Sequence, residues 1–311
     1  MPEQKKQIAV IGGANMDIGG FPDAALVAGD SNPGKVRMTV GGVGRNIAEN
    51  MARMGLKTQL ITAIGGDMNG RMLMEDCRAK GIGMDACLLE EDLGTSVYLF
   101  LGDEQGDMYC AVNDMRIQER ITPQHIERHL DMLGGMDAVV LDANLPEETI
   151  RFAAENISVP VFADAVSAAK APKLKPVLSK LYCLKPNRLE AELLTGVRIR
   201  DAMDAATAAK KLTDIGVQRV FLTMGASGAV CADSKQYLFL PNLPRSIVNA
   251  TGAGDAFTAA LVWAHAEGYD LRQSGLAGMA AASIAIESEE TVNPAMSRDA
   301  LMRRIQELQN Y

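Results

Sequence analysis

Histidine and cysteine, two side chains that often hold metal ions, are scarce in this chain. Its 311 residues include three histidines and five cysteines. The cysteines are scattered and form no CxxC pair, which indicates neither a zinc site nor a disulfide framework. His125 and His129 lie four residues apart on an expected helix and could pair on a metal. No third ligand is apparent, so a solvated helix face is the favoured interpretation.

Aromatic residues make up only 5% of the chain, and the formal charge is −8. A nucleic-acid partner is therefore not expected, because such surfaces are usually basic and carry aromatic side chains for stacking. No apolar run reaches the length that spans a bilayer, and Met1–Gln7 has no signal-peptide core. These absences favour a cytoplasmic protein, and a hydrophobic content of 48% is ample for a buried core.

Two common phosphate-binding loops are absent from the sequence. No GxxxxGK[ST] segment occurs, and the first expected strand is not followed by the spaced glycines of a dinucleotide site. A P-loop nucleotide-binding site is thereby excluded, and a dinucleotide-dependent oxidoreductase is disfavoured.

Glycine is plentiful, and one glycine-rich segment points to chemistry. Gly252, Ala253 and Gly254 precede Asp255, and a run of helix formers follows. Backbone N–H groups at the start of a helix can hold an anion. A carboxylate beside them could take a proton from a hydroxyl, as phosphoryl transfer to an alcohol requires. An ordinary turn that leads into a helix is the alternative.

Other polar residues lie at the ends of expected strands. Asn15 and Asp17 follow the strand 8–14, where α/β proteins bind ligands, so Asp17 could hold two sugar hydroxyls or close an Asx turn. Asn187 and Glu190 are three residues apart and could hold the water shell of Mg²⁺, or simply cap a helix. The turn 225–228 suits nucleotide phosphates or a hairpin.

The order of expected elements predicts an α/β fold. Helices are expected at 46–54, 70–80, 123–133, 147–156, 168–179, 256–266, 270–287 and 297–309. From residue 121, helices and strands alternate, which indicates parallel strands with helices on both faces. Two β-rich segments interrupt this pattern and are expected to form a small layer outside the main sheet. The predicted core is 1–14, 40–93 and 115–311, and the predicted lid is 15–39 and 94–114.

Four motifs occur in the order of one known family. They are Asn15-x-Asp17, Gly41-Gly-Val-Gly-Arg-Asn46, Asn187-x-x-Glu190 and Asn249-Ala-Thr-Gly-Ala-Gly-Asp255. Together they resemble the ribokinase-like, or PfkB, family of carbohydrate and nucleoside kinases, over essentially the whole chain. The resemblance implies a three-layer α/β/α core with a mainly parallel central sheet and a small β-sheet lid. It also implies an ATP-dependent kinase that uses Mg²⁺.

The resemblance assigns roles residue by residue. Asp255 matches the general base, and Gly252, Ala253 and Gly254 match the anion hole. Asn187 and Glu190 match the groups that support Mg²⁺ through water. Sugar binding falls to Asn15, Asp17, Gly41, Gly42 and Asn46. ATP binding falls to Asn187, Thr223, Gly225, Gly228, Gly252 and Gly254. Potassium-activated members carry Asp where this chain has Asn249, so dependence on a monovalent cation does not follow.

Further likeness concerns the acceptor. Ser31–Lys35, Ala111–Met115 and Leu184–Glu190 resemble family members that phosphorylate the nucleoside pseudouridine. The expected reaction transfers the ATP γ-phosphoryl group to its 5′-hydroxyl, with ribose or a purine nucleoside as the alternative acceptor. Thr95, Ser96 and Asn113, on expected lid strands, are candidates for reading the base, or each simply makes hydrogen bonds within its strand or turn. A non-catalytic sugar sensor is disfavoured, because it need not keep Asp255 or Glu190. Exposed lid edges predict a homodimer.

Overall fold

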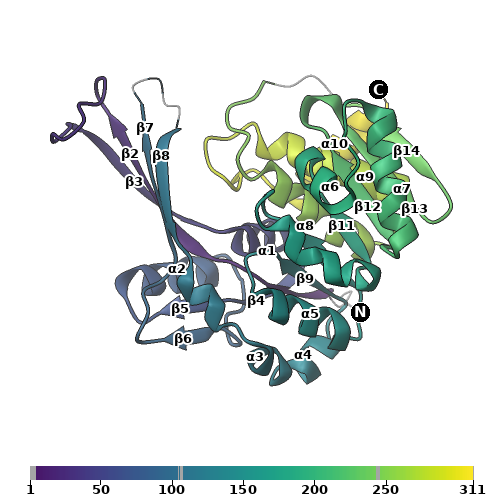
Figure 1. Cartoon of the computed structure of the whole chain (residues 1–311), viewed down its shortest axis with the longest axis horizontal. Coiled ribbons are helices and arrows are strands. Elements are labelled where there is room, and N and C mark those ends of the chain that lie inside the picture. The colour runs from purple at the N-terminus through teal and green to yellow at the C-terminus, as the bar shows by residue number, and fades with distance from the viewer. Residues whose placement is uncertain (1–4, 104, 106–107, 243–245, 311) are drawn as a thin grey trace.

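The computed structural model describes residues 5–103, 105, 108–242 and 246–310, and an eight-stranded sheet forms its centre (Figure 1). Neighbouring strands are parallel except at one edge of the sheet, where two successive pairings are antiparallel. In sheet order the strands are β14 (Tyr237–Leu240), β13 (Ala229–Asp233), β12 (Arg219–Thr223), β11 (Cys183–Lys185), β10 (Val161–Asp164), β9 (Ala138–Asp142), β1 (Gln7–Ile11) and β4 (Lys57–Ile61). Strands such as β9 are buried along their whole length because helices cover both faces.

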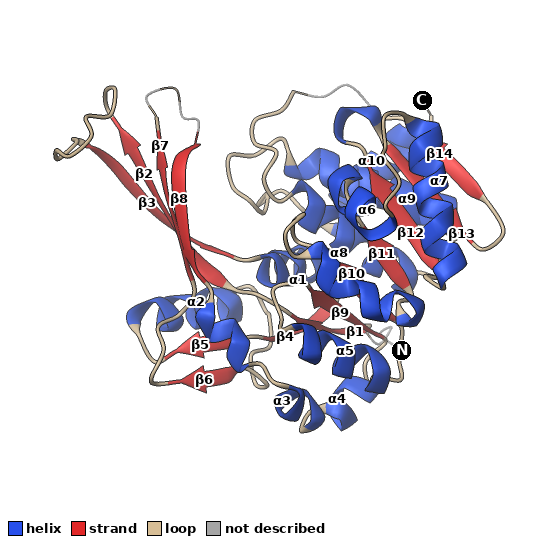
Figure 2. Cartoon of the chain, in the orientation of Figure 1, coloured by secondary structure: helices blue, strands red, loops and turns tan. Residues whose placement is uncertain are grey.

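Helices form the two outer layers (Figure 2). One face is packed against α1 (Val43–Arg53), α2 (Met68–Ala79), α8 (Ala253–Ala266), α9 (Leu271–Ala285) and α10 (Arg298–Gln309). The other face is packed against α3 (Pro123–Glu127), α4 (Leu130–Gly134), α5 (Glu147–Asn156), the 3₁₀ helix η2 (Ala171–Lys180), α6 (Arg188–Thr195) and α7 (Ala202–Ile215). The predicted three-layer α/β/α core is therefore confirmed.

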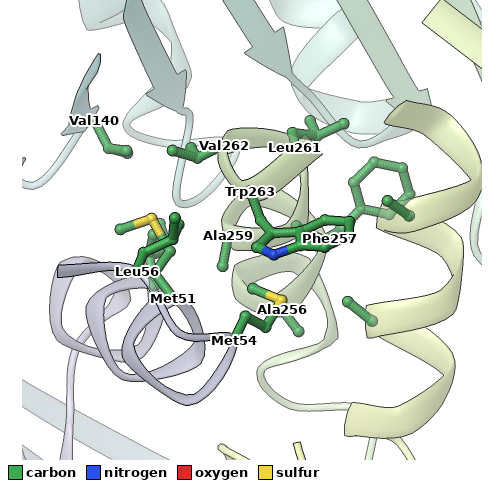
Figure 3. Packing of buried hydrophobic residues seen from close by; sticks show 14 of the residues in the cluster. Met51, Met54, Leu56, Val140, Ala256, Phe257, Ala259, Leu261, Val262 and Trp263 are labelled. Atoms are coloured by element: carbon green, nitrogen blue, oxygen red, sulfur yellow. The ribbon is translucent and has the colours of Figure 1, made fainter. Parts of the chain in front are cut away.

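Helix α8 is buried along most of its length, and this fixes the position of its first turn. Trp263 is 1% exposed and is packed edge to face on Tyr269 at 5.4 Å. Figure 3 shows Met51 and Met54 of α1 on the side of Trp263 and Ala259 of α8. Removing a buried tryptophan side chain typically costs about 3–5 kcal/mol. This packing holds α1 and α8 together, so that residues at their first turns keep a fixed separation.

A second sheet of four strands projects from the core (Figure 1). Its order is β3 (Gly34–Gly41), β2 (Asn15–Pro22), β7 (Val97–Gly102) and β8 (Met108–Asp114). The structure thus brings the two β-rich segments together as the expected small sheet. Residues 104, 106 and 107 of the turn between β7 and β8 lie outside the described residues. A short pair, β5 (Ala63–Gly65) and β6 (Leu88–Glu90), completes the strands.

Several expected elements differ in the structure. The helix predicted over 123–133 is two short helices, α3 and α4, with His129 between them. His125 is buried and its Nε2 lies 3.1 Å from the carbonyl oxygen of Ala86, so a solvated face was wrong for this residue. The described residues contain no group of three His, Cys, Asp or Glu side chains able to hold a metal.

Two further differences concern the segments 168–179 and 202–215. The segment predicted as a helix at 168–179 is the 3₁₀ helix η2, in which Pro172 and Pro176 have no N–H to donate. Helix α7, capped by Asp201, was not expected from the sequence. In the described part of the chain, no helix combines the length and the apolar character that crossing a membrane needs.

Candidate active site

The start of α8 presents open backbone N–H groups and is the candidate anion cradle. Gly252 adopts a left-handed backbone, φ 82°, and a Cβ there would overlap the carbonyl oxygen of Thr291. No side chain caps this helix, and among the described residues the N–H groups of Gly254 and Asp255 have no acceptor. Unpaired N–H groups at a helix start attract anions. The predicted anion hole therefore has the backbone geometry that it requires.

Asp255 lies in the first turn of α8, beside this cradle. Its Oδ2 accepts a hydrogen bond of 2.9 Å from Nδ2 of Asn46. Burial, and next the negative charge of Asp164, raise the pKa of Asp255 to about 7, although the Asn46 bond and the Lys185 ammonium act against the rise. A carboxylate with a pKa near neutrality is suited to exchange a proton at physiological pH.

The orientation of Asn46 is set by its neighbour. Arg45 Nη1 donates to Asn46 Oδ1 at 3.2 Å, so the amide nitrogen of Asn46 faces Asp255. Arg45 is itself 3% exposed, and its Nη2 lies 2.5 Å from Glu49 and 2.6 Å from Asp76 of α2. The ion pairs between α1 and α2 thus hold Arg45, which orients Asn46, and Asn46 contacts the candidate base.

The predicted sugar-binding residues gather at the base of the second sheet. Asn15 Nδ2 donates to Asp17 Oδ1 at 2.6 Å, and burial raises the pKa of Asp17. A Cβ on Gly41 would overlap the Asp17 carboxylate, which therefore lies over the backbone of β3. Gly42 has φ 98°, and a Cβ on it would overlap the backbone of residues 13 and 14. The chain then enters α1, which places Asn46 within hydrogen-bonding distance of Asp255.

Thr95 and Asn113, two of the candidate base readers, differ in burial. Thr95 is buried, and its hydroxyl donates to Asp67 Oδ1 at 2.7 Å and accepts from Gly65 N at 3.0 Å. That hydroxyl is already engaged, so a substrate contact by Thr95 gains no support from the geometry. Asn113 is exposed on β8, and strand register aligns it through Tyr98 with Asp17.

Three of the six predicted ATP-binding residues line a pocket of about 410 Å³, and Gly228, Gly252 and Gly254 do not. Asn187, Thr223 and Gly225 line it, together with Arg188 and Arg200. Gly228 lies behind this wall, where its carbonyl accepts from Met224 N at 2.8 Å and its φ is 91°. A Cβ on Gly228 would overlap the carbonyl oxygen of Leu240. The structure therefore places the second glycine-rich turn beside Asn187.

Asn187 and Glu190 form a capping box at the start of α6. The two Glu190 oxygens accept from N and Nδ2 of Asn187, each at 2.8 Å, and Asn187 Oδ1 accepts from Glu190 N at 3.0 Å. Burial raises the pKa of Glu190. Each carboxylate oxygen keeps a lone pair that could accept from metal-bound water, and such oxygen groups suit Mg²⁺. Capping and water-mediated metal support are thus compatible.

Three charged residues in the same region were not assigned a role from the sequence. Strand register places Asp142, Asp164 and Lys185 in one row at the carboxyl ends of β9, β10 and β11. Lys185 Nζ lies 3.1 Å from Asp164 Oδ2, and burial raises the pKa of Asp142. The signal available in the sequence was a charged residue at the end of three successive strands of an α/β sheet.

Comparison with known proteins agrees with this geometry. The model of the pfkB family carbohydrate kinases matches residues 5–298. The chain is 37% identical to the pseudouridine kinase of Escherichia coli over 94% of this chain and 95% of the relative. It is 26% identical to the guanosine-inosine kinase of Exiguobacterium acetylicum over 91% of this chain and 95% of that one.

The solved structure of Arabidopsis thaliana ribokinase with ribose and ATP superimposes with a TM-score of 0.89, at 21% identity, over 97% of this chain and 99% of that one. That likeness concerns the fold, which is ribokinase-like. The family match and the identity over nearly the full length carry the assignment of the family. The chain belongs to the pfkB family of carbohydrate kinases and is an ATP-dependent sugar or nucleoside kinase.

Proposed function

We propose that this enzyme transfers the γ-phosphoryl group of ATP to the 5′-hydroxyl of pseudouridine. The observation that supports it most directly is Asp255, held by Asn46 beside the open N–H groups of α8. The name of the Escherichia coli relative supports the choice of acceptor. Ribose or a purine nucleoside is the alternative acceptor within the same family.

In the proposed reaction, Asp255 accepts the proton of the 5′-hydroxyl as its oxygen attacks the γ-phosphorus. A new bond forms from the 5′-oxygen to phosphorus, and the bond to the β–γ bridging oxygen breaks, which releases ADP. The N–H groups of Gly254 and Asp255 stabilise the charge that develops on the transferred oxygens. When bound, Mg²⁺ would neutralise phosphate charge, held through water by Asn187 and Glu190.

The acceptor would lie between the two sheets. Asp17, oriented by Asn15, binds two ribose hydroxyls over the bare backbone of Gly41 and Gly42. The row of the second sheet continues from Asp17 through Tyr98 to Asn113. Two strand spacings amount to roughly 10 Å, which is the reach from a ribose hydroxyl to the far edge of its base. Tyr98 would then lie under the base, and Asn113 at its edge.

A monovalent cation is not required in this proposal. Nδ2 of Asn249 donates to the carbonyl oxygen of Glu289 at 3.0 Å, and its Oδ1 accepts from Thr251 N at 2.9 Å. A cation would need such oxygens as ligands, and here an N–H group occupies one of them. Turnover in potassium, sodium and choline salts at equal ionic strength tests this part, and equal rates are expected.

The projecting sheet would act as a lid and as a dimer interface. Its face opposite Asp17 carries exposed apolar residues in matched register, namely Val36, Met38, Leu99, Leu101 and Val112. A contiguous exposed apolar patch favours association with another surface. The lid of a second copy offers the same patch, so we infer a homodimer. All five cysteines, each in the described ranges, are unpaired thiols, which favours a cytoplasmic location.

Steady-state kinetics with ATP and a panel of acceptors tests the proposal. The panel contains pseudouridine, uridine, adenosine, inosine, guanosine and ribose. We expect the highest kcat/KM for pseudouridine and a phosphate ester on its 5′-oxygen by ³¹P NMR. An equal or higher value for another acceptor would overturn the choice of pseudouridine and leave the kinase assignment in place. Binding of a sugar without any ADP release would instead indicate a sensor.

A further inference from the structure

Lys185 is a buried ammonium whose hydrogen-bonding capacity is largely unused. It ends β11, is 6% exposed and lies 3.1 Å from Asp164 Oδ2. An ammonium carries three donors, and within the described part of the chain Asp164 is the one partner in hydrogen-bonding range. Burying a charge with unused donors is costly, so a structural ion pair alone explains Lys185 poorly.

Asp164 does not depend on Lys185 for its hydrogen bonds. Its Oδ2 accepts from Thr258 Oγ1 of α8 at 2.6 Å, and its Oδ1 accepts from Val166 N at 2.9 Å. Val166 has a left-handed backbone, φ 63°, which a β-branched residue adopts only at a cost. The carboxylate is therefore held firmly from two sides, and it holds the lysine in turn.

The ammonium faces the anion cradle. A Cβ built on Gly254 would lie 2.9 Å from Lys185 Nζ, and outside its own turn of helix no other atom would come within 4 Å of it. The missing side chain of Gly254 thus leaves room directly in front of the ammonium, at the helix start where N–H groups are open. A positive charge and open N–H groups converge on the same small space.

The charge of Lys185 is secured by the groups around it. Burial lowers its pKa, but Asp164 of β10, Glu190 of α6 and Asp255 of α8 more than offset this, and the net pKa is raised. The ammonium form therefore persists at neutral pH. Without a phosphate, the three carboxylates compensate the buried charge, while two N–H donors remain for an incoming anion.

We infer that Lys185 donates to an oxygen of the transferred phosphoryl group and is a catalytic residue of the proposed kinase. This inference rests on the proposed function. Lys185 stays protonated throughout, and no bond to it forms or breaks. Its charge stabilises the phosphoryl oxygens while the bond to the leaving β-phosphate weakens. The group that Lys185 would bind is the γ-phosphate, which ATP carries and ADP lacks.

The test compares Lys185→Met with Lys180→Met. The second variant removes an exposed charge from η2 and serves as the matched control. Loss of one preorganised donor typically lowers kcat by about 10²–10³-fold, and this is expected for Lys185→Met alone. Its affinity for a non-hydrolysable ATP analogue should fall at least about tenfold, while ADP affinity changes by less than about threefold. A kcat within about threefold of the control would overturn the inference.

A double variant separates catalysis from structural pairing. Lys185→Met combined with Asp164→Asn removes both charges, so it should fold even where the single variant does not. If the pair were only structural, the double variant would regain activity; we expect it to remain as slow as Lys185→Met. The nucleotide-binding comparison needs no acceptor. It therefore tests Lys185 even if no acceptor in the panel is phosphorylated, which would refute only the proposed function.

Discussion

Asn46 of α1 donates its amide N–H to Asp255 of α8 across 209 residues of sequence, at 2.9 Å. The contact couples the glycine-rich start of α1 to the candidate base. It lowers the pKa of a carboxylate that burial and Asp164 raise to about 7. The strength of the base is therefore a balance between these opposing effects, and each can be changed separately by mutation.

Asp255→Asn should bind ATP and acceptor but lose about 10²–10⁴-fold in kcat, because the amide cannot accept the proton. In the wild type, kcat/KM should rise with pH up to about 7, as Asp255 ionises. Since its folded pKa lies above the unfolded one, wild-type stability falls as pH rises towards 7. Asp255→Asn should thus melt higher than the wild type at pH 8 but not at pH 4. Retention of more than a tenth of kcat refutes the role of Asp255 as base.

Asn46→Ala should raise the pH at which activity is half maximal, because it removes a hydrogen bond that favours the ionised Asp255. Arg45→Met should shift the profile in the same direction, since it frees the Asn46 amide to turn. Arg53→Met is the control: Arg53 pairs with the same Glu49 but does not touch Asn46. An unshifted pH profile for Arg45→Met would show that Arg45 is structural only.

Glu190→Gln should raise the Mg²⁺ concentration needed for half-maximal activity, by about tenfold, because the negative charge that orders metal-bound water is lost. Glu155→Gln, which removes an exposed carboxylate from α5, is the control. Titration of Mg²⁺ at fixed ATP measures both variants. Identical curves for the two would mean that Glu190 only caps α6.

Val112→Glu should convert the homodimer into a monomer, because it places a charge in the apolar face of the lid. Ala111→Glu is a matched control on the same strand: Ala111 is also exposed, but it pairs with Phe100 and lies on the face opposite Val112. Analytical ultracentrifugation distinguishes the two states. A monomeric wild type contradicts the interface.

In hydrogen exchange, residues 15–39 and 94–103 should gain protection together on addition of nucleoside.

Asn113→Ala should reduce the preference for pseudouridine over uridine, because a buried base N–H without its partner costs about 1–3 kcal/mol. Turnover of ribose, which has no base, should change little. Thr39→Ala serves as the control, since Thr39 lies in the same row on the other side of Asp17. If the ratio of kcat/KM values for the two nucleosides stays the same, another residue reads the base.

The glycine-rich motifs and the alternation of helices and strands could be predicted because they depend on local sequence. Gly42 and Gly252 take left-handed backbones that other residues rarely adopt, so their spacing alone predicts turns that open helices. The family resemblance was confirmed by the match over nearly the whole chain. The roles of the individual site residues stay predictions, and the structure adds their distances and partners.

What the sequence did not predict depends on contacts between distant segments. Lys185 and Asp164 meet only because β10 and β11 are neighbours in the sheet. The pairing of Arg45 with Asp76 depends on how α2 lies against α1. His125 is buried by its place beside Ala86, which no local pattern reveals. Helix α7 is the exception, because its local signals were present: Asp201 caps its start, alanine favours the helix and Gly216 follows its end.

Only Gly42 separates the end of β3 from the first residue of α1. The strand proposed to support the sugar and the helix that orients the candidate base are therefore one nearly continuous piece of backbone. A lid taken from a relative to alter acceptor choice could not be exchanged as an independent module at this junction. A chimera joined after Gly42 would have to recreate the entry angle of α1, and an error there would reach the Asn46–Asp255 contact directly. A change at this junction would therefore alter acceptor preference and the strength of the base together.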